Sequence, residues 1–304
     1  MNIHERIETI ISHMQHVFLG QEHVVTSILC AFFARGHVLL EGVPGVGKTL
    51  IALALAKLLN LSFKRIQFTN DLLPSDVTGF HTFRSPVDSM DLIKGPLFAS
   101  IVLADEINRT SPKTQSALLE AMEESQVTID GMTYVLPEPF MVIATQNPIE
   151  VTGTFPLPES QLDRFLIKTI VGYPPVEKEA EILRKDIDHS DALGLEPVTD
   201  RHEILQLLAR VNTIIVHPDI LGYIGAIVRT SRAHREIELG ISPRGGLALK
   251  RASQAYAFIH GRAFVTPGDV QSVCPWVLAH RIIVKQGNAE RVIEEILNEV
   301  ELPL

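Results

Sequence analysis

Short apolar runs alternate with longer helix-favouring segments along the first half of the sequence. Most of these runs are continuously apolar, which is typical of strands buried on both faces. Strands separated by helices predict a parallel sheet with helices on both of its sides. Two helices are predicted before the first strand, at residues 3–19 and 24–32, because their apolar residues recur at helical spacing. The predicted strands lie at residues 37–40, 63–68, 101–104, 140–144 and 165–170.

Two insertions interrupt this alternation. Residues 71–98 carry three prolines and two glycines, too many for one helix, and residues 79–83 and 91–95 could pair as two short strands. In the second insertion, residues 126–136, Asp130-Gly131 lies between two β-favouring runs. This dipeptide is a strong hairpin signal, so we expect a hairpin before the fourth strand.

The second half of the sequence follows Tyr173-Pro174-Pro175 and shows helical patterns alone. Proline cannot donate to a strand ladder and stiffens a connection, so we place the domain boundary there. The prediction is an αβα domain over residues 1–172 and a smaller all-helical domain over residues 173–304. Its predicted helices cover residues 177–185 and begin near Asp200, Pro218, Pro243 and Thr266.

Composition narrows the class of protein. The chain has 304 residues, 46% of them hydrophobic and 21% charged, with a net charge of -9. The acidic balance argues against a nucleic-acid sleeve. Cys30 and Cys274 have no metal-type spacing and are expected to be buried in a reducing compartment. The sequence begins without a signal-peptide pattern, and its longest uncharged run, residues 24–34, is too short to span a membrane. We therefore expect a cytoplasmic protein.

The first predicted strand runs into a glycine-rich segment, Gly-Val-Pro-Gly-Val-Gly-Lys-Thr at residues 42–49, and a helix-favouring run follows. Strand, glycine-rich loop and helix in this order form the P-loop pattern. Glycines let successive backbone N–H groups turn towards phosphate oxygens, and the helix N-terminus adds the positive end of its dipole. Lys48 would reach the β- and γ-phosphates of ATP, and Thr49 would bind Mg²⁺ through its hydroxyl. The predicted nucleotide-binding residues are Gly42, Pro44, Gly45, Val46, Gly47, Lys48, Thr49, Leu50 and Asp105, and the predicted Mg²⁺ ligands are Thr49 and Asp105.

Polar groups follow the third and fourth predicted strands. Asp105 and Glu106 come directly after the third strand, where Asp105 would help to hold Mg²⁺ and Glu106 would polarise the attacking water. Asn147 lies at the tip of the fourth strand and could hydrogen-bond both the γ-phosphate and water. The alternative interpretation is that Asn147 only begins an Asn-Pro turn.

Two arginines complete the candidate chemistry. Arg164 directly precedes the fifth strand and could reach a neighbouring subunit's γ-phosphate, a contact that contributes on the order of 10³–10⁵ in rate. The alternative is a surface pair with Asp163, which would contribute little. Arg244 lies at a helix start, where the dipole disfavours a cation, so it needs an anion or solvation, and nucleotide phosphate is the better hypothesis.

Two further features carry weaker hypotheses. Residues 18–21 could lie against a nucleotide base or form an ordinary helix–helix turn. Three glutamates on the helix that begins near Ser111 are expected to be surface charges: Glu120, Glu123 and Glu124.

Over almost its whole length the sequence resembles the MoxR-type AAA+ ATPases, the helix-2-insert clade. The resemblance rests on the P-loop and on residues 103–109, 144–148, 162–165 and 242–245. The two insertions match the helix-2 insert and the pre-sensor-1 hairpin of that clade. The resemblance implies that Lys48 and Thr49 are Walker A residues, Asp105 and Glu106 Walker B residues, Asn147 sensor 1, Arg164 the arginine finger and Arg244 sensor 2.

The resemblance also implies a function. It implies an AAA+ αβα domain with a helical lid, ATP hydrolysis with Mg²⁺, and a ring that is commonly a homo-hexamer. The partner would be a protein client that is remodelled, activated or loaded with a cofactor, with von Willebrand factor A domain proteins as one class. Arg244 could act within its own subunit or across the interface.

Rival functions remain at this stage. One is a nucleotide-gated scaffold with little turnover, against which Glu106, Asn147 and Arg164 argue. Another is a nucleic-acid motor, against which the acidic charge argues. A small-molecule P-loop kinase fits badly with the helical second domain.

Overall fold

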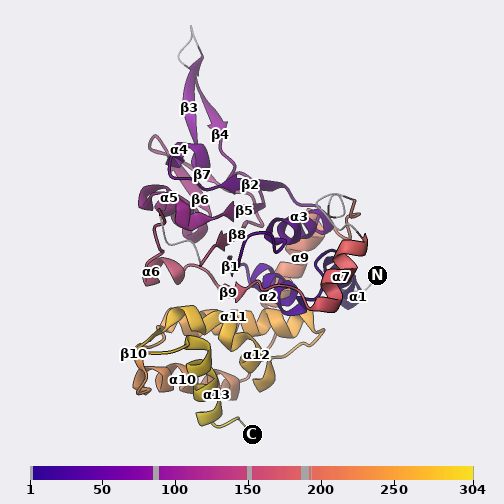
Figure 1. Ribbon diagram of the computed structural model, residues 1–304, viewed down its shortest axis with the longest axis vertical. Coiled ribbons are helices and arrows are strands. Elements are labelled where there is room, and N and C mark those ends of the chain that lie inside the picture. The colour runs from indigo at the N-terminus through magenta and orange to yellow at the C-terminus, as the bar shows by residue number, and fades with distance from the viewer. Residues whose placement is uncertain (1–2, 85–88, 149–152, 186–191, 193, 304) are drawn as a thin grey trace.

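A five-stranded sheet forms the centre of the computed structural model, which describes residues 3–84, 89–148, 153–185, 192 and 194–303 (Figure 1). The strand order is β2-β5-β8-β1-β9, and every neighbouring pair is parallel. The predicted parallel sheet is therefore confirmed. Its strands are β1 (Val38–Glu41), β2 (Phe63–Gln67), β5 (Ile101–Asp105), β8 (Met141–Gln146) and β9 (Ile167–Ile170).

Both faces of this sheet are buried, as the apolar runs predict. Along β1, Val38 and Leu40 belong to one apolar core and Leu39 to the other, because successive side chains point to opposite faces. The first core includes residues of α1 (Ile3–Val17), α2 (Glu22–Phe33) and α3 (Lys48–Leu58). The second includes residues of α4 (Pro74–Thr78) and α5 (Pro112–Glu124). The sheet is thus the middle of three layers.

The two insertions form hairpins, as expected. In the first, β3 (Gly79–Arg84) pairs antiparallel with β4 (Ser89–Lys94), and residues 85–88 of this predicted insertion lie outside the described residues. In the second, β6 (Gln126–Ile129) pairs with β7 (Met132–Val135). Asp130 and Gly131 between them both have positive φ, 49° and 81°, which is the backbone that a two-residue hairpin turn requires.

His81 of β3 links the two hairpins. The His81 ring lies with Nδ1 2.8 Å from the Asp130 carboxylate and Nε2 2.9 Å from the Tyr134 hydroxyl. The insertions therefore contact each other through a buried polar side chain, although some 50 residues of sequence separate them.

The C-terminal part is helical, and two features of it differ from the prediction. A short antiparallel pair, β10 (Ile237–Leu239) and β11 (Ile283–Val284), lies within the helical region. These strands are too short to leave an alternating pattern in the sequence. The last helix, α13, was not among the helices expected from the sequence. The helices of this region are α10 (Pro218–Ala233), α11 (Pro243–Ile259), α12 (Pro267–Leu278) and α13 (Ala289–Glu299).

Two helices beyond residue 173 lie beside the first domain (Figure 1). The helix α7 (Val176–Lys185) lies against Gly20, in the turn between α1 and α2. The helix α9 (Arg201–Val211) packs against α2. Glu203 of α9 makes an ion pair with Arg6 of α1 at 2.6 Å. The boundary at residue 172 stays a prediction.

The cysteines and the helices bear on the other sequence expectations. Cys30 and Cys274 are both free and buried, as predicted. The structure shows no helix, in the ranges described above, with the length and apolar character needed to cross a bilayer. The remaining short elements are α6 (Glu159–Leu162) and the 3-10 helices η1 (Ile107–Arg109) and η2 (Ala279–Arg281).

Stability is expected to fall at mildly acidic pH because of His37, which precedes β1 and is 7% exposed. Its Nδ1 accepts from the Val142 backbone N–H at 2.9 Å, so Nε2 carries the proton and donates to the Met122 carbonyl at 3.0 Å. Burial lowers the pKa of His37 from 6.5 to about 4. The unfolded chain therefore binds the proton first, and stability present above pH 6.5 is lost as the pH falls towards 4.

The full loss from this residue is on the order of 3 kcal/mol. Urea unfolding of the wild type and of His37→Gln between pH 7.5 and 4.5 measures it. The variant should show a shallower decline of the free energy of unfolding over that range, since glutamine can donate and accept without titrating. Equal declines would show that His37 does not titrate differently in the two states.

Candidate functional site

The glycine-rich loop connects β1 to α3 at the carboxyl edge of the sheet. Gly45 and Gly47 both have a φ of +85°, a left-handed conformation that side chains disfavour. A Cβ on Gly42 would lie 2.3 Å from the Val171 carbonyl oxygen, so no larger residue fits there without movement. Among the other predicted loop residues, Pro44 is exposed and Val46 is buried. The glycines therefore allow a tight loop whose backbone faces the solvent at its tip.

Lys48 begins α3 and folds back over this loop. Its side chain is buried, with the residue 9% exposed, and Nζ donates to the Gly42 carbonyl at 2.6 Å. Burial lowers the pKa of Lys48, while the nearby carboxylates of Asp105 and Glu106 act in the opposite direction. The loop, the ammonium group and both carboxylates thus lie within one electrostatic environment. Thr49 and Leu50 follow in the first turn of α3, with Thr49 half-buried and Leu50 buried.

Asp105 ends β5 between two neighbouring strands. Its Oδ1 accepts from the Thr145 hydroxyl of β8 at 2.5 Å. Its Oδ2 accepts from Arg65 of β2, with Nη2 at 2.7 Å. A positive charge is therefore accommodated directly beside this carboxylate.

Glu106, the next residue, leaves the strand in a strained conformation. Its φ is 58°, in the left-handed region, a departure that costs about 1–3 kcal/mol and is typical of functional sites. The Glu106 backbone N–H donates to the Thr145 hydroxyl oxygen at 2.8 Å. Its carboxylate accepts from Gln67 Nε2 at 2.9 Å and from Arg109 Nη1 at 3.0 Å. The side chain is therefore held between β2 and η1.

Asn147 follows β8, the strand between β1 and β5. It is buried, and its carbonyl accepts from the Asn108 side chain at 3.4 Å. The strand order puts it between the loop, which follows β1, and the two carboxylates, which follow β5. Residues 149–152 beyond it lie outside the described part of the chain.

Arg164 lies at the opposite edge of the sheet. The strand β9 runs parallel to β1, with Ile167 opposite Val38. Arg164 precedes β9 whereas the glycine-rich loop follows β1, so the length of β1 separates them. Four residues of strand span about 13 Å at ~3.3 Å per residue. The structure therefore does not bring Arg164 together with its own loop.

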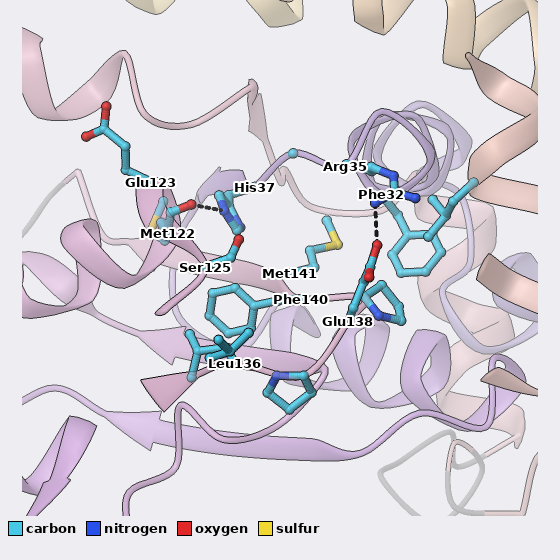
Figure 2. A pocket seen from close by; sticks show the side chains of 15 residues that line it. Phe32, Arg35, His37, Met122, Glu123, Ser125, Leu136, Glu138, Phe140 and Met141 are labelled. Atoms are coloured by element: carbon cyan, nitrogen blue, oxygen red, sulfur yellow. Dashed lines mark hydrogen bonds and ion pairs between the residues drawn. The ribbon is translucent and has the colours of Figure 1, made fainter. Parts of the chain in front are cut away.

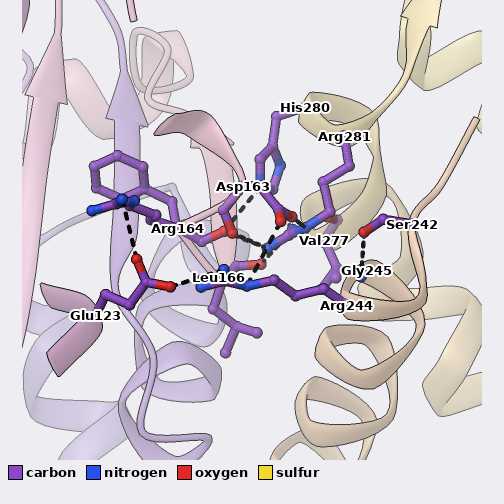
Figure 3. A network of polar contacts seen from close by, with 11 residues as sticks. Glu123, Asp163, Arg164, Leu166, Ser242, Arg244, Gly245, Val277, His280 and Arg281 are labelled. Carbon is purple, nitrogen blue, oxygen red and sulfur yellow. Dashed lines mark hydrogen bonds and ion pairs between the residues drawn. The ribbon is translucent and has the colours of Figure 1, made fainter. Parts of the chain in front are cut away.

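Both predicted arginines instead bind Glu123 at the end of α5 (Figure 3). Arg164 Nη2 lies 3.1 Å from one Glu123 carboxylate oxygen, and Arg244 Nη1 lies 3.1 Å from the other. Arg244 Nε is also 3.7 Å from Asp163. Within the described residues, these carboxylates are the ion-pair partners of the two arginines. Glu123 is an exposed charge, as expected, and it also forms ion pairs with both arginines.

The residues that hold the two carboxylates were not among those predicted from the sequence. Arg65 and Gln67 lie on β2, the strand next to β5, and Gln67 is directly opposite Asp105 in the register. Alternating polar residues on a strand were a possible signal. They could not be assigned to these carboxylates because the order of strands in the sheet does not follow from the sequence.

A pocket of about 370 Å³ lies at the amino edge of the sheet (Figure 2). His37 and Phe140 line it, and the ion pair between Arg35 and Glu138, 2.5 Å long, lies beside them. Because these residues precede β1 and β8, the pocket is at the other edge from the glycine-rich loop. It is therefore separate from the candidate nucleotide site.

Comparison with known proteins agrees with this geometry. A family model described as the ATPase family associated with various cellular activities (AAA) matches residues 37–167, and an AAA lid domain model matches residues 229–300. A crystal structure of a protein from Cytophaga hutchinsonii has a TM-score of 0.89 and 36% identity, covering 98% of this chain and 95% of that one. The fold and the loop thus define the class of AAA+ ATPases.

Curated relatives narrow the class further. Chaperone MoxR1 of Mycobacterium tuberculosis is 38% identical over 98% of this chain and 82% of that protein. Protein MoxR of Methylorubrum extorquens is 31% identical over 88% of this chain and 84% of its own. YeaC of Bacillus subtilis is 46% identical over 100% of this chain and 97% of that protein. The chain belongs to the MoxR family of AAA+ ATPases.

The close approach of Gly42 to β9 makes a stability prediction. Gly42→Ala would force its Cβ against the Val171 carbonyl, so we expect a loss of roughly 1–3 kcal/mol in the free energy of unfolding. Gly172→Ala is the matched control, because a Cβ there meets nothing within 4 Å. The control should change stability by less than about 0.5 kcal/mol. Urea unfolding measures both, and equal effects would contradict the contact.

Proposed function

We propose that this protein hydrolyses ATP in a site that a neighbouring copy completes, and that it uses the cycle to remodel a protein client. The observation that carries the proposal is the division of the predicted residues between two edges of the sheet. Lys48, Asp105 and Glu106 lie at the carboxyl edge, whereas Arg164 lies at the amino edge. An arginine finger at that edge is directed towards another subunit.

The carboxyl edge fits a nucleotide with Mg²⁺. The left-handed glycines and the buried Lys48 suit a polyphosphate. A phosphate oxygen would replace the Gly42 carbonyl as the hydrogen-bond acceptor of Lys48 Nζ. Thr49 and Asp105 would hold Mg²⁺, which supplies positive charge against the β- and γ-phosphates. The Arg65 guanidinium beside Asp105 supports this fit, since it shows that a cation is stable there.

Residues 18–21 support the base hypothesis over an ordinary turn. A Cβ on Gly47 would lie 3.0 Å from the Phe18 ring, so this ring packs against the loop. Gln21 is 4% exposed, and its Nε2 donates to the Gly172 carbonyl at 2.8 Å. Its Oε1 is buried and has no hydrogen-bond partner within the described residues. The exocyclic amino group of adenine would satisfy that oxygen.

Water activation falls to Glu106 and Asn147. The Asp105 carboxylate is bonded to the Thr145 hydroxyl, whereas the Glu106 carboxylate accepts from Gln67 and Arg109 and can accept a proton from water. Gln67 and Arg109 fix its position through hydrogen bonds. Asn147 can orient the water and the γ-phosphate from its place between the strands.

Arg164 and Arg244 would act together on the neighbouring subunit. They share the Glu123 carboxylate, so they lie side by side on one surface of the molecule (Figure 3). A γ-phosphate bound by the next subunit could replace Glu123 as their anionic partner. This arrangement favours Arg244 acting across the interface, and a closed ring, commonly a hexamer in the family, repeats it at every seam.

The client and the compartment are further parts of the proposal. The printed name of Chaperone MoxR1 and the family resemblance support a protein client, with von Willebrand factor A domain proteins as one class and cofactor insertion as one outcome. The β3–β4 hairpin, held to the β6–β7 hairpin by His81, protrudes from the molecule and offers a surface for contact with it (Figure 1). Two free, buried cysteines support a cytoplasmic location.

Removing the catalytic carboxylate tests the hydrolysis. Glu106→Gln keeps the shape of the side chain but loses the base, so we expect kcat to fall by about 10²–10⁴ while ATP affinity is retained. Phosphate release and equilibrium binding of ATP measure the two quantities. Glu299→Gln, at the exposed last residue of α13, is the control and should match the wild type. Unchanged turnover in Glu106→Gln would overturn the assignment.

Mixing two inactive variants tests the shared site. Arg164→Ala should bind ATP but lose roughly 10³-fold in kcat, and Lys48→Ala should not hydrolyse ATP at its own loop. In mixed assemblies, intact loops of the first variant meet intact fingers of the second, so activity should return. A mixture as inactive as either variant alone would contradict a finger that acts across the interface.

A further inference from the structure

Arg281 of η2 crosses from the helical lid to the segment that carries Arg164. Its side chain is only 4% exposed. On the lid side it donates to the carbonyl of Val277, and the rest of the guanidinium points to residues 163–166 (Figure 3). Burial lowers the pKa of Arg281, and the Asp163 carboxylate opposes that shift. A buried cation directly beside the finger requires an explanation.

The contacts of Arg281 surround Arg164 on both sides along the chain. Nε donates to Asp163 Oδ1 at 2.7 Å, and Nη2 donates to the Asp163 carbonyl at 3.2 Å. Nη2 also donates to the Phe165 carbonyl at 2.6 Å, and Nη1 donates to the Leu166 carbonyl at 3.1 Å. The backbone of this turn between α6 and β9 is therefore bonded to one lid side chain.

The neighbouring residue adds to this attachment. His280 is buried, with Nε2 3.0 Å from the Phe165 carbonyl. Arg244, also of the lid, approaches Asp163 and shares Glu123 with Arg164. Lid residues thus contact the finger segment, residues 163–166, at its backbone carbonyls and at the Asp163 carboxylate. They also contact Glu123, the ion-pair partner of Arg164.

We infer that Arg281 is a positioning residue for Arg164: it fixes the finger segment to the lid, so that Arg164 and Arg244 reach the neighbouring subunit as one unit. The inference rests on the proposed function, since an arginine finger contributes to catalysis only if ATP is hydrolysed at the interface. A planar guanidinium suits this position because its five N–H groups can bond several carbonyls and a carboxylate at once. Movement of the lid would then move the finger, which links the nucleotide states of adjacent sites.

Another lid ion pair provides the matched control. Arg262 makes a bidentate pair with Asp269 of α12, with Nη2 2.5 Å from Oδ1. Both pairs join an arginine to a half-buried or buried aspartate, but the Arg262 pair lies entirely within the lid. A purely structural role for Arg281 would make Arg281→Lys and Arg262→Lys behave alike.

The test compares these two variants by ATP turnover, ATP affinity and thermal unfolding. Arg281→Lys keeps the charge but loses the planar set of donors, so we expect kcat to fall at least 10-fold with ATP affinity within twofold of the wild type. Arg262→Lys should lower Tm and leave kcat unchanged. Mixed with Lys48→Ala, Arg281→Lys should regain activity, because its intact loops then receive correctly placed fingers.

Two results would overturn the inference: wild-type kcat in Arg281→Lys, or a loss that mixing with Lys48→Ala does not restore. If Arg281→Lys shows no cooperative unfolding, Asp163→Asn replaces it, with the same measurements and the same interpretation. The proposed function fails separately, if the wild type releases no phosphate or if the mixture of Arg164→Ala with Lys48→Ala stays inactive. Recovery in that mixture together with no recovery for Arg281→Lys would reject the positioning role alone.

Discussion

Parallel pairing of β1 with both β8 and β9 is the constraint on which the rest of the structure depends. It collects the carboxyl ends of the strands at one edge, where the glycine-rich loop, Asp105 and Asn147 meet. It also places the residues that precede β9, Arg164 among them, at the other edge. One register therefore assembles most of a nucleotide site and at the same time excludes its arginine. The proposed need for a second subunit rests on this strand direction, before any detail of the side chains.

Local signals explain how much of this could be predicted from the sequence. The glycines of the loop, the apolar runs and Asp130-Gly131 each determine their own backbone, and the structure confirms them. Pairings between distant segments left no such signal. Arg65 reaches Asp105 only because β2 lies next to β5, and Glu123 meets Arg244 only because the lid packs against the first domain, with η2 in contact with α6. The strands β10 and β11 were missed since two or three residues carry no periodicity.

The charged contacts fall into two groups: those that fix the carboxylates of the nucleotide site, and those that fix the segment carrying Arg164. At the carboxyl edge, Arg65, Gln67 and Arg109 keep two adjacent carboxylates in place despite the left-handed backbone of Glu106. At the amino edge, Arg281 gives the finger segment the hydrogen bonds that no strand partner supplies. A lid that is bonded to the finger can transmit a change at one nucleotide to the next site, and this is the physical basis that a ring-shaped remodelling protein requires.

The central claim is that Arg164 leaves Glu123 for a phosphate held by another copy. A structure of the Glu106→Gln assembly with bound ATP tests it most directly. The account predicts the Arg164 guanidinium of one subunit within hydrogen-bond distance of the γ-phosphate in the next, with its bond to Glu123 broken. ATP bound in every loop, with Arg164 still paired to Glu123 of its own subunit and no neighbouring guanidinium at the γ-phosphate, would contradict it.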